Sequence, residues 1–107
     1  MLLIDNLKYR SAINRIYYSM FYSLLAIALK IGFQSSKHAQ LIGWFNKTFI
    51  KEGLLEKKFG RIINQAFIRR TQGDYDSFVE FNHEAVKLLF DDMQVFNAAI
   101  DRWINNN

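Results

Sequence analysis

The sequence predicts an all-α protein, an up-and-down bundle of four to five helices in one domain over residues 1–107. The chain contains no proline, so the strongest helix breaker is missing and its five glycines become the main punctuation. Apolar residues recur at intervals of three and four in four segments, and no stretch alternates strictly between apolar and polar residues. At this length, one hydrophobic core is expected.

The first helix is expected over about residues 8–31, ending at Gly32. Apolar residues cover most of its circumference in two stripes, one of which runs from Ile13 to Ile31 and the other from Tyr18 to Leu29. A helix of this kind belongs in the middle of a core or at a subunit interface. The apolar run meets Lys30 before it reaches the roughly 18–20 residues that a bilayer requires, so no membrane span is expected.

Two further helices are expected in the middle of the chain. One covers about residues 37–51, with Ser36 as its N-cap and a stop at Gly53. The next covers about 55–72, with Gly73 as its C-cap. The connections are short, which favours antiparallel neighbours.

The last helix carries apolar residues at helical spacing from Val86 to Trp103. Asn82 is the expected N-cap, because an asparagine side chain can accept a hydrogen bond from the first turn. Ser77 with Glu80 also fits a capping box, which would begin the helix one turn earlier.

Charge is distributed unevenly over the chain. Residues 1–70 hold twelve basic and three acidic side chains, whereas residues 71–107 hold two basic and seven acidic ones, for a net charge of +4. Such asymmetry indicates either an anion-binding surface on the first part or electrostatic pairing between the two parts. The residues alone leave both possibilities open.

The residue types present exclude several kinds of site. Cysteine is absent, which rules out disulfides, thiolate chemistry and zinc ribbons and favours a cytoplasmic location. His38 and His83 have no second ligand at metal-binding spacing, so neither a metal nor another cofactor is expected. His38 nevertheless follows Lys37 at a helix start, where a phosphate group is favoured. Glycine-rich phosphate loops and nucleophile elbows are missing, so conventional hydrolase chemistry gains no support.

The segment "RRTQGDY" places Arg69 and Arg70 in the last turn of a predicted helix, followed by Asp74 and Tyr75. Basic residues there complement the helix dipole without any further role. Asp74 would then belong to a turn and Tyr75 to the core. The other interpretation is a phosphate-binding site, and composition does not decide between the two.

A second candidate surface lies on the first helix, where Tyr17, Tyr18 and Tyr22 follow Arg15. Tyrosine rings can stack on bases, and an arginine can hold a phosphate with two hydrogen bonds. The alternative is a core helix whose first turns are simply solvated.

Three blocks, "YRSAINRIYYSMFYSLLAIAL", "KHAQLIGWFNKTFI" and "RRTQGDYDSFVEF", resemble the HEPN domain family, in particular its small stand-alone branch, over about residues 9–100. The resemblance implies a helical bundle that dimerises, with a nucleotide or RNA cleft along the dimer interface. In related two-gene systems the HEPN protein is a toxin, usually a metal-independent ribonuclease. A minimal nucleotidyltransferase neutralises it and can transfer AMP to a HEPN tyrosine.

The resemblance assigns roles to individual residues. Arg70 matches the family arginine and would contact phosphate, while Asp74 would fix Arg70 or its loop. Tyr75 stands where the ribonucleases carry a histidine, as a nucleotide-facing ring or the AMP acceptor. Because tyrosine has a reference pKa of about 10, it exchanges protons poorly near neutral pH. The proton-transfer group would therefore be absent or would come from His38.

We therefore expect a HEPN-type nucleotide- or RNA-binding protein, a cytoplasmic homodimer and the toxin-like half of a toxin–antitoxin pair with a nucleotidyltransferase. One alternative is a non-catalytic helical dimerisation or protein-interaction module, and another is a ribonuclease that uses His38 with Arg70. Family members usually begin with a further helix, which is expected to be shortened or missing in this sequence. The predicted nucleotide- or RNA-binding residues are Arg15, Tyr18, Lys37, Arg69, Arg70 and Asp74.

Overall fold

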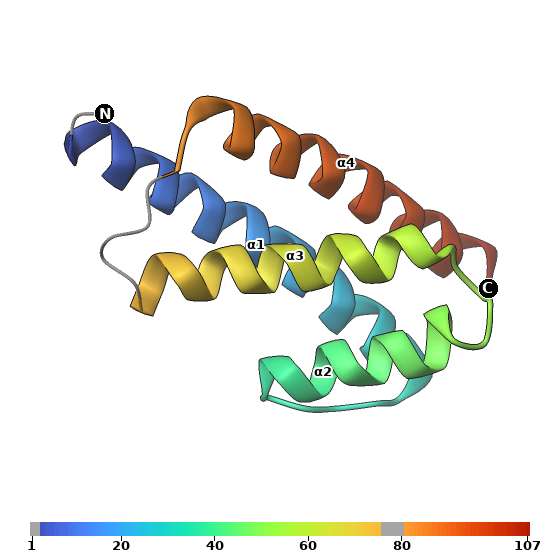
Figure 1. Ribbon diagram of the computed structural model, residues 1–107. Helices are drawn as coiled ribbons and strands as arrows, with labels where there is room; N and C mark the ends of the chain where they lie inside the picture. Colours follow the sequence, from blue (N-terminus) through green and yellow to red (C-terminus); the bar gives the residue numbers. More distant parts are fainter. Residues whose placement is uncertain (1–2, 76–80) are drawn as a thin grey trace.

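The computed structural model describes residues 3–75 and 81–107, with side chains for 7–72 and 81–107, and the described part is helical without strands. Figure 1 shows α4 above, α3 across the middle, α2 below and α1 passing between them. The all-α prediction is confirmed. The elements are α1 (Leu3–Ile31), α2 (His38–Phe45), the π-helix η1 (Asn46–Ile50), α3 (Lys57–Tyr75) and α4 (His83–Asn106).

Helix α1 is the central element and packs against α2, α3 and α4. The predicted core stripe is buried as far as Ile27, with Tyr17 and Leu24 fully covered, whereas its last residue, Ile31, is 46% exposed. The second stripe behaves differently, because Tyr22 is 65% and Leu29 71% exposed. One apolar side of α1 therefore packs into the core, and the other apolar side is exposed.

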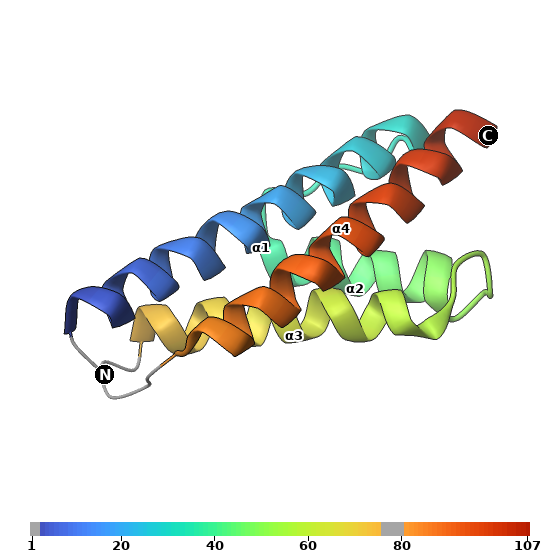
Figure 2. The ribbon, with the colours of Figure 1, turned by 90° about the horizontal axis from the view of Figure 1, so that it is seen from above.

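Helix α2 does not run antiparallel to α1, which is the arrangement expected for neighbouring helices. Figure 2 shows α1 and α4 running in the same direction and α3 running in the opposite one. Residues 32–37 return along the bundle, so that His38 begins α2 beside Tyr17 in the middle of α1. Six extended residues reach about 20 Å, the rise of roughly thirteen helical residues, which makes this return possible.

Two predicted helix ends are confirmed. Gly32 adopts a φ of 96°, and its N–H and that of Phe33 both bond to the Ala28 carbonyl oxygen, which closes α1. Asn82 caps α4, since its side-chain oxygen accepts a hydrogen bond from the Ala85 N–H at 2.8 Å.

Two other predicted ends are wrong. Lys37, without a side-chain cap, takes the N-cap position of α2 expected for Ser36, while the Ser35 hydroxyl accepts the Lys37 N–H at 3.1 Å. Helix α3 continues through Gly73 to Tyr75. A glycine inside a helix costs only about 1 kcal/mol relative to alanine, so it does not end a helix by itself. The capping-box alternative at positions 77 and 80 lies outside the described residues.

The predicted second helix is divided into α2 and the π-helical turn η1, which approaches α3 closely at Gly60. A Cβ at Gly60 would lie 2.7 Å from the Asn46 side-chain oxygen and 3.3 Å from Ile50. The Asn46 amide donates a hydrogen bond across this contact to the Asn64 side-chain oxygen at 3.2 Å. Gly60 thus allows the two elements to pack at short range.

A polar contact joins α1 to α4 beside the core. Ser23 donates a hydrogen bond to the Asn97 side-chain oxygen at 2.7 Å, and the Asn97 amide donates to the Ser19 hydroxyl at 2.9 Å. Because both the oxygen and the nitrogen of the Asn97 side chain are hydrogen-bonded to α1, the register of α1 and α4 is fixed. Among the described helices, none combines the length and apolarity required to cross a bilayer.

Candidate functional site

A polar cluster forms where the start of α2 and the end of α3 meet the middle of α1. The Tyr17 hydroxyl and His38 Nδ1 lie 2.7 Å apart, and an Arg70 Nη2–H donates to the Tyr18 hydroxyl at 3.2 Å. These contacts join residues that are 21 and 52 positions apart in the sequence. The cluster, here called the Tyr–His–Arg site, consists of Tyr17, Tyr18, Phe21, His38 and Arg70.

The two tyrosines present different faces to the site because neighbouring residues on a helix point about 100° apart. Tyr17 is fully buried and Tyr18 is half-buried, and their rings meet edge to face with centroids 5.5 Å apart. The Arg70 guanidinium carbon lies 5.7 Å from the Tyr17 ring centroid and 5.6 Å from that of Tyr18. Both aromatic faces therefore attract the cation and hold it beside the hydroxyls.

His38 is held by stacking as well as by its hydrogen bond. Its ring lies 4.0 Å, centroid to centroid, from the ring of Phe21 at an interplanar angle of 19°. Burial lowers the pKa of His38, and the positive charge of Arg70 lowers it further. The imidazole is consequently neutral at pH 7, the form that can accept a proton.

Tyr17 remains a neutral phenol over the whole physiological range. Burial raises its pKa to about 12, with Arg70 opposing the rise and Tyr18 adding to it. A neutral hydroxyl can accept a hydrogen bond from Nδ1–H of His38. In that tautomer, His38 Nε2 carries the free lone pair.

The site thus combines a guanidinium with a neutral imidazole. Arg70 can bind an anion, and His38 can take or return a proton near neutral pH. In the part of the chain that the structure describes, no three histidine or carboxylate side chains are grouped as a metal site would require. The chemistry that this geometry supports best is phosphate binding with proton transfer.

Comparison with known proteins identifies the family. The family model for the HEPN domain matches residues 1–103. The chain belongs to the HEPN family. It is 39% identical over 105 residues to a "UPF0332 protein" of Thermotoga maritima, covering 98% of this chain and 80% of that protein. A "Putative toxin" of Methanocaldococcus jannaschii is 33% identical over 90 residues, covering 84% and 67%. No solved structure matches the chain.

Not every predicted site residue of this HEPN protein lies in the Tyr–His–Arg site. Lys37 is exposed beside His38, and Arg69 is exposed next to Arg70. Arg15 instead lines a separate cleft between α1 and α4, with a volume of about 560 Å³. Asp74 and Tyr75 belong to the last turn of α3, but their side chains lie outside the described residues.

No sequence pattern connects Tyr17 or Phe21 to His38. Its spacing predicts Tyr17 both on the core stripe and on a tyrosine surface, and both predictions are partly true, because the buried ring carries a hydroxyl that needs a partner. A tyrosine at a position surrounded by aliphatic core residues is the signal that indicates a buried polar contact. Phe21 has no such signal, since an apolar ring is unremarkable on a core face.

Proposed function

We propose that this HEPN protein binds RNA and cleaves it without a metal ion, with Arg70 as the phosphate ligand and His38 as the proton-transfer group. The observation that carries this proposal is the convergence of His38 and Arg70 on Tyr17 and Tyr18. It supplies a proton acceptor although Tyr75 occupies the position at which HEPN ribonucleases carry a histidine.

The reaction would be an attack of the ribose 2′-oxygen on the neighbouring phosphorus. His38 Nε2 accepts the 2′-hydroxyl proton as the oxygen–phosphorus bond forms, and the bond from phosphorus to the 5′-oxygen breaks. The leaving oxygen takes a proton from water, and the hydroxide that remains takes the proton held by His38. The products are a 2′,3′-cyclic phosphate, a 5′-hydroxyl and neutral His38. Arg70 stabilises the negative charge that builds up on the phosphoryl oxygens. The contact with the Tyr17 hydroxyl holds the orientation of His38, and the proposed step uses the tautomer in which His38 Nδ1–H donates to that hydroxyl.

A toxin-like role for this chain, with a nucleotidyltransferase as antitoxin, is supported by the toxin names of two relatives. Tyr75, five positions after Arg70, is the proposed AMP acceptor. An added AMP would bring a negative phosphate close to Arg70 and compete with RNA for it. RNA as the target agrees with the cytoplasmic location that the lack of cysteine predicts.

A homodimer is also proposed, with α1 as its surface. Tyr22 and Leu29 lie on one side of α1, two turns apart, and are 65% and 71% exposed. Exposed apolar side chains of this size are typical of interfaces. Leu29→Glu is expected to shift the molar mass measured by light scattering from dimer to monomer, whereas Lys30→Glu is not.

The cleavage proposal is tested with single-stranded RNA in excess EDTA. The wild-type chain is expected to produce 2′,3′-cyclic phosphate ends, and His38→Ala to lower the rate by about 100-fold or more. His83→Ala is the matched control, because His83 is exposed at the start of α4, and it should retain the wild-type rate. Equal activity of His38→Ala and wild type would disprove the role of His38.

The regulatory proposal needs a separate measurement. The chain is incubated with ATP and a nucleotidyltransferase encoded beside its gene, and its intact mass is recorded. A gain of AMP units that disappears in Tyr75→Phe supports Tyr75 as the acceptor. A gain that persists in Tyr75→Phe assigns the modification to another residue.

A further inference from the structure

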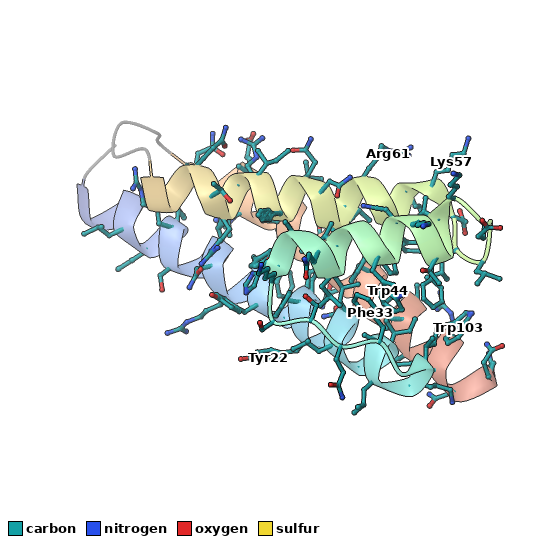
Figure 3. The ribbon with its side chains drawn as sticks, turned by 90° about the horizontal axis from the view of Figure 1, so that it is seen from below. Tyr22, Phe33, Trp44, Lys57, Arg61 and Trp103 are labelled. Atoms are coloured by element: carbon teal, nitrogen blue, oxygen red, sulfur yellow. The ribbon has the colours of Figure 1, made fainter. Side chains whose placement is uncertain are left out.

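A second basic feature lies away from the Tyr–His–Arg site, where η1 meets the start of α3. A pocket of about 470 Å³ opens there, lined by the cationic residues Lys51, Lys57 and Arg61. Figure 3 shows Lys57 and Arg61 projecting on one side of the α2–α3 layer, while the aromatic residues Phe33 and Trp44 lie on the other. The pocket thus lies on a polar surface that is separate from the aromatic residues.

The three cations of this pocket are available to a ligand. No ion pair involves Lys51, Lys57 or Arg61 within the described part of the chain, and no carboxylate lines the pocket. The nearby Glu56 is directed to Lys58, which lies 3.9 Å from it. Three cationic side chains around one depression, with no carboxylate among its lining residues, repel each other and favour a bound anion.

The floor of the pocket is built by the close contact at Gly60. Because Gly60 has no side chain, Asn46 and Ile50 of η1 approach the α3 backbone and leave a depression between the two elements. Asn64 lines the same depression, and its side-chain oxygen is engaged by Asn46. The Asn64 amide N–H groups remain as neutral donors beside the cations.

We propose that this pocket, bounded by Lys51, Lys57 and Arg61, is a second RNA contact that binds the phosphodiester backbone away from the cleavage site. The inference rests on the proposed function, since RNA is taken as the ligand. The pocket and His38 lie at opposite ends of the continuous α2–η1 segment, about 18 Å apart along its axis. A single strand of several nucleotides spans that distance, so the pocket would select longer RNA over dinucleotides.

The test uses a triple variant, Lys51→Gln, Lys57→Gln and Arg61→Gln, with all three changes at exposed positions. The matched control removes three exposed charges elsewhere: Lys30→Gln, Lys87→Gln and Arg102→Gln. Binding of a 2′-O-methyl 20-nucleotide RNA, which resists cleavage, is measured over a range of salt. Cleavage of a dinucleotide is measured in parallel, and circular dichroism checks the fold.

The triple variant is expected to bind the 20-nucleotide RNA at least tenfold more weakly, with the control changed less than threefold. The slope of log affinity against log salt should become shallower by about 2, because each phosphate contact on a single strand contributes about 0.7. Dinucleotide cleavage should stay within twofold of wild type in both variants.

Equal losses in the triple variant and the control would overturn this inference and leave the proposed cleavage site intact. A wild-type chain that binds the RNA through the pocket but cleaves nothing would overturn the proposed function alone. If polyglutamate binding depends on the pocket and RNA binding does not, the site recognises acidic protein and the inference is wrong. If wild type binds no RNA, both proposals fail.

Discussion

Two aromatic clusters, one at each end of α2, serve different purposes. In the apolar cluster, Phe45 lies 5.7 Å from Phe96 and Phe49 lies 4.8 Å from Trp103, centroid to centroid, with edge-to-face geometry. Its three phenylalanines are fully buried and carry no polar atoms. In the Tyr–His–Arg site the rings are similarly close, but hydroxyl, imidazole and guanidinium groups lie between them.

The difference shows where the molecule gains stability and where it gives some up. Burying a phenylalanine side chain contributes about 1.5–3 kcal/mol, whereas a hydrogen bond contributes only about 0.5–1.5 kcal/mol net. The Tyr–His–Arg site, moreover, desolvates His38 and lowers its pKa. A group held in an unfavourable environment beside an arginine is typical of functional sites.

The largest expected effect is on the apolar cluster. Phe96→Ala should lower the free energy of unfolding by about 3–5 kcal/mol, because it removes a fully buried ring and leaves a cavity. Denaturant unfolding measures this change. Val95→Ala, at a neighbouring position that is 45% exposed, is the control and should change stability by less than about 1 kcal/mol. Similar losses in both variants would contradict the assignment of Phe96 to the core.

The second prediction concerns Arg70, where function should suffer more than stability. Arg70→Lys keeps the charge but loses the planar fork and the stacking on both tyrosines. RNA affinity should fall about tenfold, roughly 1.4 kcal/mol. Arg69→Lys, at the exposed neighbouring position, should leave affinity unchanged in the same titration. An equal loss for both substitutions would contradict the specific role of Arg70, and no loss in either would mean that binding depends only on the positive charge at this helix end.

The third prediction isolates the buried hydroxyl. Tyr17→Phe should lower the free energy of unfolding by about 0.5–1.5 kcal/mol, because it removes the contact with His38 and keeps the ring. Absorbance titration of the folded protein should also lose its last-ionising tyrosine, since the pKa of Tyr17 is raised to about 12. Tyr22→Phe, at a position exposed in the single chain, should keep the late step, and retention of that step in Tyr17→Phe would refute the assignment.

The smallest expected effect is a pH dependence of stability. The pKa of His38 is lower in the folded chain than its ordinary value of 6.5, so the unfolded chain binds the proton first as pH falls. The contribution of His38 is fully present above pH 6.5 and is lost as pH falls through the lowered pKa. The melting temperature of wild type should therefore drop more than that of His38→Gln between about pH 7.5 and pH 5.5.

The pH prediction has an internal control in the other histidine. His83→Gln removes an exposed imidazole at the start of α4 and should keep the wild-type pH dependence. If His38→Gln and wild type lose melting temperature equally over this range, His38 is not desolvated as the fold indicates. RNA cleavage should follow the same acid limb, because protonated His38 cannot accept the 2′-hydroxyl proton.

The predictable parts of the fold are those governed by local chemistry. Asn82 caps its helix and Gly32 ends α1 as expected, because each satisfies backbone groups through its own side chain or its own φ. The same rules predict Ser36 as an N-cap and Gly73 as a C-cap, but tertiary context decides otherwise at both positions. Residue preference at a helix end is small, about 1 kcal/mol, and packing of the whole helix easily exceeds it.

The sequence by itself determined four helical segments, a core-facing stripe on α1 and a set of cations and tyrosines able to handle phosphate. Only the tertiary structure decided that His38 and Arg70 share one site, since residues 32–37 run back along α1 and α3 runs antiparallel to it. The physical reason is the sequence separation of the contacts, because hydrophobic periodicity indicates only contacts within a few helical turns. Contacts over 21 and 52 positions depend on loop paths and on which faces pack together.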